Sequence, residues 1–243
     1  MHQTFAETLS FALLGGILPA VLWLALWLFE DEKHPEPKRR IFKAFAAGAL
    51  LVPVALLVER ISAEFLGYSV GNPLGSFNFN FPALLMFAAI EEIAKLAAAY
   101  FSSFRHNKDF DEPVDTMIYL ISAALGFAAF ENALFIERGL TNHVGVNLLV
   151  YSGSLRFVGA TLLHVVSSGL LGGFLAYTFW KKRHAGALAM GLGSVILLHA
   201  VFNFFILKGS GGIAAILTFV FLWFAAFMLI SVFQKIKHLK HIA

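Results

Sequence analysis

Cysteine is absent from this chain of 243 residues. Disulfide bonds, thiolate–metal sites and a cysteine nucleophile are therefore excluded. Charge is also scarce: Asp, Glu, Lys and Arg make up 14% of the residues, whereas 59% are hydrophobic and 27 are Phe. This balance is typical of a protein that crosses a membrane several times. The net charge of +3 accompanies no nucleic-acid-binding motif, so we expect a lipid bilayer and no nucleic acid as partner.

Several hydrolase motifs are missing as well. The zinc motif HExxH does not occur, and all four Asp residues lie in loops or at the ends of apolar segments. A membrane protease with a pair of intramembrane aspartates is therefore excluded. The segment Gly67-Tyr68-Ser69-Val70-Gly71 matches G-x-S-x-G, but no strand-to-helix turn is predicted around it. We therefore interpret this match as a chance one.

Long apolar runs are abundant, and seven of them are long enough to cross a bilayer. The predicted fold is all-α, a polytopic transmembrane helix bundle of about seven spans, with residues 1–243 forming a single integral membrane domain. Residues 61–80 have a mixed composition, so we expect them to lie at the interface or to re-enter the membrane partway. The expected spans are residues 5–29, 41–58, 81–104, 114–136, 155–180, 185–207 and 213–233.

The basic residues predict the orientation of the chain. Of the 18 Lys and Arg residues, 13 fall in one alternate set of loops together with the C-terminal tail. Because basic loops stay on the cytoplasmic side, we expect the N-terminus outside and the C-terminus in the cytoplasm. The expected location is the cell membrane of a bacterium or an archaeon.

The strongest chemical signal is Glu91-Glu92-x-x-Lys95, in the middle of the third expected span. Each ionisable residue at the bilayer centre costs about 2.5–3.5 kcal/mol on insertion. Three such residues are retained only where they face the protein interior and have a role. A packing salt bridge to Lys95 is the structural alternative, since both carboxylates lie three or four residues from it. Two carboxylates for one ammonium exceed what such a bridge needs.

Further polar residues lie in the next three expected spans, at a depth similar to that of Glu91. At ~1.5 Å per residue they form one layer between the bilayer centre and the outer face. Singly, each has a structural explanation, such as a hydrogen-bonded core histidine or an amide that links two helices. Together they indicate a site at the centre of the bundle. These residues are Glu131 and Asn132 in span four, His164 in span five, and His199 and Asn203 in span six.

In this order the motifs resemble the PrsW family of intramembrane proteases, which belongs to the superfamily of CAAX prenyl endopeptidases and bacteriocin-processing enzymes. The motif-bearing core covers about residues 81–207. The resemblance implies an endopeptidase that cleaves membrane-protein substrates such as anti-sigma factors. It rests on Glu91-Glu92-x-x-Lys95, then Phe127-x-x-x-Glu131 followed by Asn132, then His164, and finally His199-x-x-x-Asn203.

Carboxylates and histidines in one buried layer are suited to activating a water molecule. Glu91 or Glu92 is expected to deprotonate this water while His164 helps to hold and polarise it. The resemblance favours Glu91 as the base.

The remaining polar residues are expected to assist this step. His199 and Asn203 would donate hydrogen bonds to the oxyanion of the tetrahedral intermediate. Lys95, Glu131 and Asn132 would support the site, with Glu131 orienting Lys95 or a histidine.

We expect a glutamic-type peptidase without a cofactor. Only two intramembrane histidines are available, and the ammonium of Lys95 would repel a nearby dication. A zinc-dependent version of the same protease stays open, because Glu and His both bind Zn²⁺. Its metal ligands would be Glu91, Glu92, His164 and His199.

Two further classes of function stay open. A proton-coupled transporter could use Glu and His at mid-bilayer as relay groups. The absence of a repeated half with matching broken helices argues against it. A non-catalytic membrane scaffold is the other alternative, and it would be expected to lose the Glu-Glu pair that this chain retains.

Overall fold

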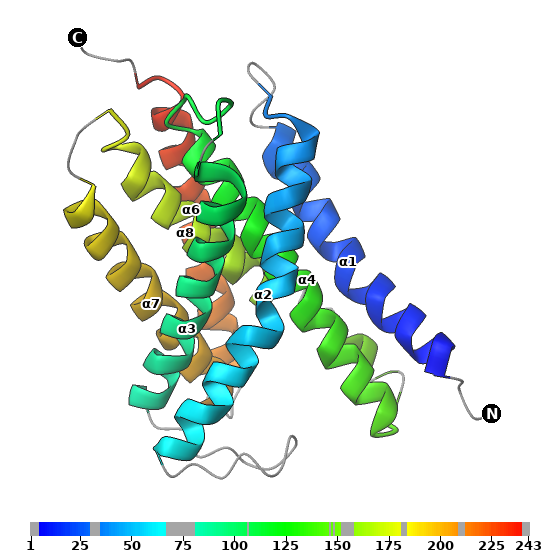
Figure 1. The fold of residues 1–243 in the computed structure, drawn as a ribbon. Coiled ribbons are helices and arrows are strands. Elements are labelled where there is room, and N and C mark those ends of the chain that lie inside the picture. The colour runs from blue at the N-terminus through cyan, green and yellow to red at the C-terminus, as the bar shows by residue number, and fades with distance from the viewer. Residues whose placement is uncertain are drawn as a thin grey trace.

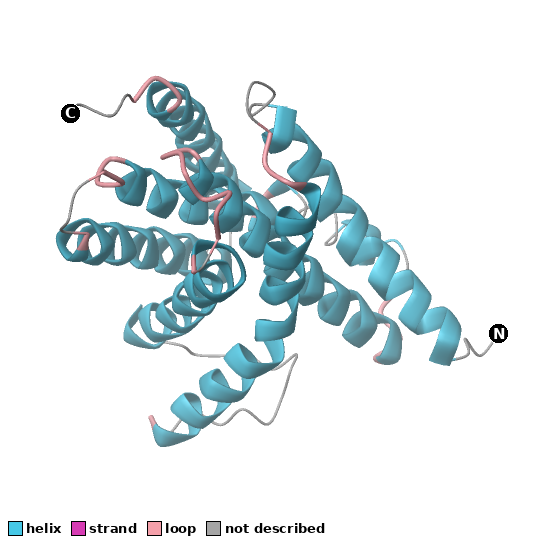
Figure 2. Cartoon of the chain, turned by 45° about the horizontal axis from the view of Figure 1, so that its top comes forward, coloured by secondary structure: helices cyan, strands magenta, loops and turns pink. Residues whose placement is uncertain are grey.

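The computed structural model describes residues 5–29, 35–66, 81–105, 107–145, 147, 149–151, 158–180, 184–208 and 212–239. Over these residues the chain forms helices joined by loops, without a strand (Figures 1 and 2). The all-α class predicted from the sequence is therefore confirmed for the described part of the chain. The helices are α1 (Phe5–Phe29), α2 (Lys38–Phe65), α3 (Phe81–Ala99), the π-helical turn η1 (Tyr100–Phe104), α4 (Asp115–Thr141), α6 (Ala160–Ala176), α7 (Ala185–Lys208) and α8 (Gly212–Ile236).

Five of these helices, α1, α2, α4, α7 and α8, are long and apolar enough to cross a membrane. The other two expected spans, residues 81–104 and 155–180, contain the helices α3 and α6, which are not among these five. Helix α3 has 19 residues but carries three charged side chains near its middle, and α6 has only 17 residues. The fifth expected span, residues 155–180, is thus shorter as a helix than predicted. Figure 1 shows α3 running between α2 and α7, alongside helices that are long enough to span.

Helix α2 extends further than the second expected span. It continues to Phe65, so the first residues of the expected interfacial segment 61–80 are helical. Arg60 and Glu64 form an ion pair of 3.1 Å at i, i+4 on the exposed face of this part of the helix, which adds a small stabilisation. Residues 67–80, and with them the G-x-S-x-G match, lie outside the described residues.

Helix α4 is the central helix of the bundle. It is buried along its length from residue 115 to residue 129 and contacts α1, α2, α3 and α6. A helix surrounded in this way is expected to be mostly apolar on every side, and most of the buried residues of α4 are apolar. Small residues also let the neighbouring backbones approach: Gly126 lies against the carbonyl of Phe45, and Gly48 of α2 lies against the carbonyl of Ala123.

We expect Gly126→Ala to destabilise the protein by about 1–3 kcal/mol, because the added methyl group would overlap the Phe45 carbonyl of α2. Helix backbone cannot move aside as a flexible side chain can. Thermal unfolding in detergent measures the effect. The matched control is Gly193→Ala in α7, where an added methyl group meets no atom within 4 Å. Equal stability of the two variants would show that the α2–α4 contact tolerates a wider spacing.

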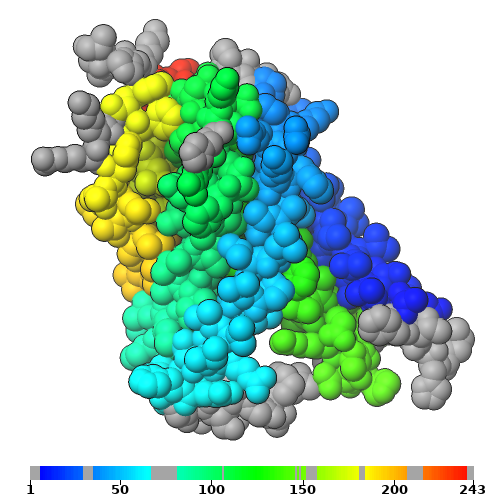
Figure 3. Space-filling view, viewed as in Figure 1, coloured from blue at the N-terminus to red at the C-terminus, as the bar shows by residue number. Residues whose placement is uncertain are grey.

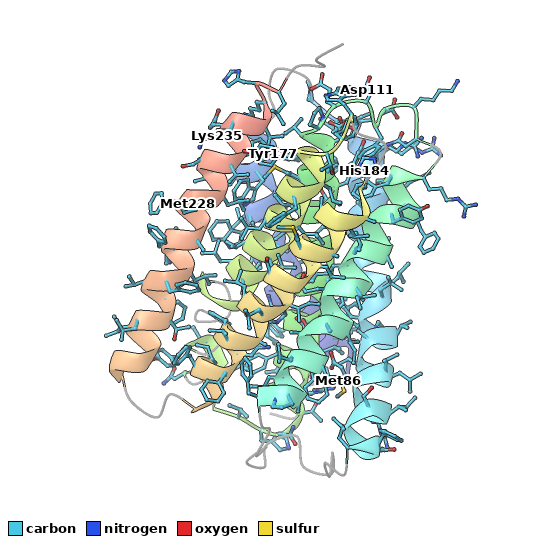
Figure 4. The ribbon with its side chains drawn as sticks, turned by 90° about the vertical axis from the view of Figure 1, so that its left-hand side faces the viewer. Met86, Asp111, Tyr177, His184, Met228 and Lys235 are labelled. Atoms are coloured by element: carbon cyan, nitrogen blue, oxygen red, sulfur yellow. The ribbon has the colours of Figure 1, made fainter. Side chains whose placement is uncertain are left out.

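Polar contacts close the end of the bundle where α4 begins. The Tyr119 hydroxyl donates to the buried carboxylate of Glu36, and Asp115 accepts hydrogen bonds from the backbone N–H groups of Asp111 and Glu112. Burial raises the pKa of the Glu36 carboxyl above its ordinary value, although the hydrogen bond from Tyr119 opposes this. Figure 4 places Asp111 and His184 at this end and Met86 of α3 near the other. The charged residues of α3, Glu91, Glu92 and Lys95, follow Met86 toward the end where Asp111 lies.

Candidate active site

Helix α3 turns its three charged side chains into the bundle. Glu91, Glu92 and Lys95 share a helix face with Ala88 and Ala98, and all of this face is buried. Glu91 is 9% exposed, and Glu92 and Lys95 are fully buried. Desolvating three ionisable groups is costly, so they must be paired with one another or with polar groups of other helices.

Lys95 and Glu92 form the centre of a buried polar network. The Nζ atom of Lys95 lies 2.6 Å from Oε1 of Glu92 and also donates to Oγ of Ser167 at 3.4 Å. The same Glu92 oxygen lies 2.8 Å from Nδ1 of His199. The ammonium group therefore neutralises Glu92, and both α6 and α7 are tied to α3 through this pair.

These contacts set the tautomer of His164. The Lys95 Nζ atom lies 3.1 Å from Nδ1 of His164, and an ammonium group can only donate. Nδ1 of His164 is therefore the acceptor, and Nε2 carries the hydrogen. This Nε2 lies 2.9 Å from Oε2 of Glu131, to which it donates. Glu131 thus orients a histidine, one of the two roles that the sequence suggested for it.

His199 has the opposite tautomer. Its Nδ1 donates to the carboxylate of Glu92, which leaves the lone pair of Nε2 available. Nε2 lies 3.6 Å from Oε2 of Glu91, too far for a direct hydrogen bond and close enough for both atoms to share one water. Oε2 of Glu91 has no hydrogen-bond partner among the described residues. Oε2 of Glu91 and Nε2 of His199 are therefore two hydrogen-bond acceptors that lie close together.

The two amides of the predicted site lie on α4 and α7. Asn132 donates to Oγ1 of Thr161 at 2.9 Å and so links α4 to α6. Asn203 lies one turn after His199 on α7 and is partly buried. Sequence reasoning missed Ser167 and Thr161, although each lies three residues from His164 and therefore on the same helix face.

Known proteins match most of this chain. A family model described as "PrsW family intramembrane metalloprotease" matches residues 36–231. A protein named Protease PrsW from Oceanobacillus iheyensis is 31% identical over 87% of this chain and 91% of its own length. Proteins of that name from Geobacillus kaustophilus and Bacillus subtilis are 29% and 27% identical, over 93% and 86% of this chain and 91% and 89% of their own lengths. No solved structure matches significantly.

Proposed function

The chain belongs to the PrsW family of intramembrane proteases, and on that premise we propose that it cleaves membrane-protein substrates with a water molecule activated by Glu91. Family membership identifies an integral membrane peptidase, which leaves the transporter and scaffold alternatives without support. The observation that carries the proposal is the pairing of Oε2 of Glu91 with Nε2 of His199 across 3.6 Å, inside a buried site.

The proposed reaction begins with a water held between Glu91 and His199. The water donates one hydrogen bond to each of these acceptors, which directs an oxygen lone pair toward the scissile carbonyl. As the water oxygen bonds to the carbonyl carbon, its proton passes to Glu91. Glu91 then gives this proton to the amide nitrogen as the carbon–nitrogen bond breaks. The products are a new carboxyl terminus and a new amine.

The other polar residues hold this arrangement. Glu92 fixes the His199 tautomer that leaves Nε2 as an acceptor, and Lys95 keeps Glu92 ionised beside it. Glu131 of α4 and His164 of α6 are bound to each other and lie at the border of the site. Asn203 can donate to the oxyanion, and this role stays a prediction from its spacing to His199.

The family description names a metalloprotease, so the fit of a cation must be considered. Glu91, Glu131 and His164 offer ligand atoms that lie within 4.8 Å of one another, which favours a metal site. The hydrogen bonds of His164 argue against a metal site. Nδ1 accepts from the Lys95 ammonium group, so Nε2 carries the hydrogen and donates it to Glu131, and a protonated nitrogen cannot bind a cation. The side chains as arranged do not fit a divalent cation, and we propose a metal-free site. The zinc-dependent version is the second candidate, carried by the three converging groups.

We expect cleavage to survive prolonged treatment with a strong chelator, because the proposed base and acceptor act without a cation. The assay compares cleavage rates before and after chelation and dialysis, with the zinc content of the protein measured alongside. A HExxH metalloprotease treated in parallel is the control for effective removal. Loss of activity on chelation that added Zn²⁺ restores would support the metal-dependent version instead.

The proposed substrates are single-span membrane proteins of the anti-sigma-factor class, as the family resemblance implies. The proposed orientation places the N-terminus outside and the C-terminus in the cytoplasm, supported by the uneven distribution of Lys and Arg. Figure 1 shows the two termini at opposite ends of the molecule. Incubation of the purified protein with candidate substrates, followed by mass spectrometry of the products, tests the activity and locates the cleaved bond.

A further inference from the structure

A basic cavity lies where α2 begins. It has a volume of about 350 Å³ and is formed by the start of α2 and the loop between η1 and α4. Among the five residues that line it, Asp109 is the one acidic residue, and its Oδ2 atom lies 3.3 Å from Nε of Arg40. Three cationic side chains therefore face one carboxylate, and the lining has a net positive charge. The lining residues are Pro37, Arg39, Arg40, Lys43 and Asp109.

The charges at this end of α2 are the opposite of those that a helix start favours. The N-terminal end of a helix carries a partial positive charge, which acidic side chains or bound anions stabilise. The first turn of α2 has no acidic residue, and Pro37 at its N-cap makes no side-chain hydrogen bond. Lys38, Arg39, Arg40 and Lys43 add further positive charge there. An anion held in the cavity would offset this repulsion.

The cavity lies at the depth of the lipid headgroups. Helix α2 has 28 residues and is long and apolar enough to cross a membrane. At ~1.5 Å per residue it is about 42 Å long, which exceeds the ~30 Å hydrocarbon core of a bilayer. Residues 44–58 carry no charge and fit this core. The basic first turns of α2 therefore lie outside it, among the headgroups of one leaflet.

An exposed apolar stripe continues from the cavity along the same face of α2. Leu50, Val54 and Leu57 follow Arg39 by 11, 15 and 18 residues, which are close to whole numbers of helical turns. Their side chains are 73%, 52% and 58% exposed. Figure 3 shows α2 at the surface of the molecule along its length, from its first turns to its other end. This face thus combines a cationic end with an apolar continuation.

We propose that the cavity and the stripe bind one anionic phospholipid, with its phosphate group in the cavity and an acyl chain along the stripe. Arg39 and Lys43 lie one turn apart on the face that carries the stripe, and they contact the phosphate group. Clusters of Lys and Arg next to a membrane span attract anionic lipids in this way. A free phosphate ion or an acidic peptide would fill the cavity alone and leave the stripe without a partner. The lipid site is separate from the peptidase site and does not depend on which residue activates the water.

The lipid composition beside Leu50 tests the proposal. Because the chain has no cysteine, Leu50→Cys can carry a single fluorophore, which brominated acyl chains quench. In bilayers of phosphatidylcholine with a minor share of phosphatidylglycerol, brominated phosphatidylglycerol should quench this probe well beyond its share of the lipid. The same label on Phe227→Cys, an exposed position of α8, is the control. It should be quenched only in proportion to that share.

Charge variants distinguish a bound lipid from general attraction to a basic surface. Replacing both Arg39 and Lys43 by Gln should lower the preference for phosphatidylglycerol at Leu50→Cys by about 5- to 30-fold, the effect of removing one or two basic contacts near the membrane surface. The matched control replaces Lys235 and Lys237 by Gln. It removes two positive charges where α8 ends, at the same end of the molecule as Asp111 (Figure 4), and should leave the preference unchanged.

Three results would contradict the proposal. Quenching at Leu50→Cys in proportion to the lipid share would show that no lipid is bound selectively. An equal loss of preference in the α8 control would show general attraction by charge. Displacement of phosphatidylglycerol by excess inorganic phosphate, at constant ionic strength, would show a site for the ion alone. If the double Gln variant does not fold, Asp109→Asn replaces it: this change makes the cavity more positive, so the preference must rise.

Discussion

Glu91→Gln is expected to lower kcat/KM by about 10³-fold while the protein stays folded. Glutamine has the shape of glutamate but cannot take the proton of the attacking water, and a positioned base contributes about 10²–10⁴-fold. Oε2 of Glu91 has no hydrogen-bond partner among the described residues, so the exchange breaks no strong contact there. Cleavage rates measure the loss, and thermal unfolding in detergent confirms that the fold is kept.

Variants of the neighbouring residue Glu92 show which of the two glutamates is the base. Glu92 is bound by Lys95 and His199, so its replacement should also lower the rate, but with a loss of stability that Glu91→Gln does not share. Replacing His164 should impair cleavage too, because it holds Glu131 in place. Glu64→Gln is the control for the loss of a surface carboxylate. If Glu91→Gln cleaves normally while a folded Glu92→Gln variant does not, Glu92 is the base.

The burial of the site could be predicted from the sequence because it follows from solvation. Three ionisable residues in an apolar run have to face the interior, and the structure buries Glu91, Glu92 and Lys95 together. The depth of His164 and His199 followed from counting residues along each helix. These arguments need only helix geometry and the cost of exposing charge to lipid.

The partners within the site could not be predicted in the same way. Whether Lys95 meets Glu91 or Glu92, and which histidine nitrogen it approaches, depends on how α3, α6 and α7 are rotated about their axes. Contacts elsewhere set those rotations, such as the close approach of Gly172 in α6 to the backbone of Met117 in α4.

The same network leads to the largest expected effect on stability, in the variant Lys95→Met. Methionine fills a similar volume but leaves the fully buried Glu92 without its cation, and breaking a buried ion pair in this way costs about 3–5 kcal/mol. The double variant Glu92→Gln, Lys95→Met removes both charges and should recover most of this loss. Thermal or denaturant unfolding in detergent measures both variants.

The recovery distinguishes the charge of Lys95 from its packing. If Lys95 mattered only as a space-filling side chain, the single and double variants would lose similar stability, and the coupling between the two positions would be near zero. A buried pair predicts a coupling of several kcal/mol. The double variant should nevertheless stay inactive, because without the Glu92 carboxylate nothing fixes the His199 tautomer that leaves Nε2 facing Glu91. A stable double variant that cleaves at the wild-type rate would separate His199 from water activation and contradict the mechanism.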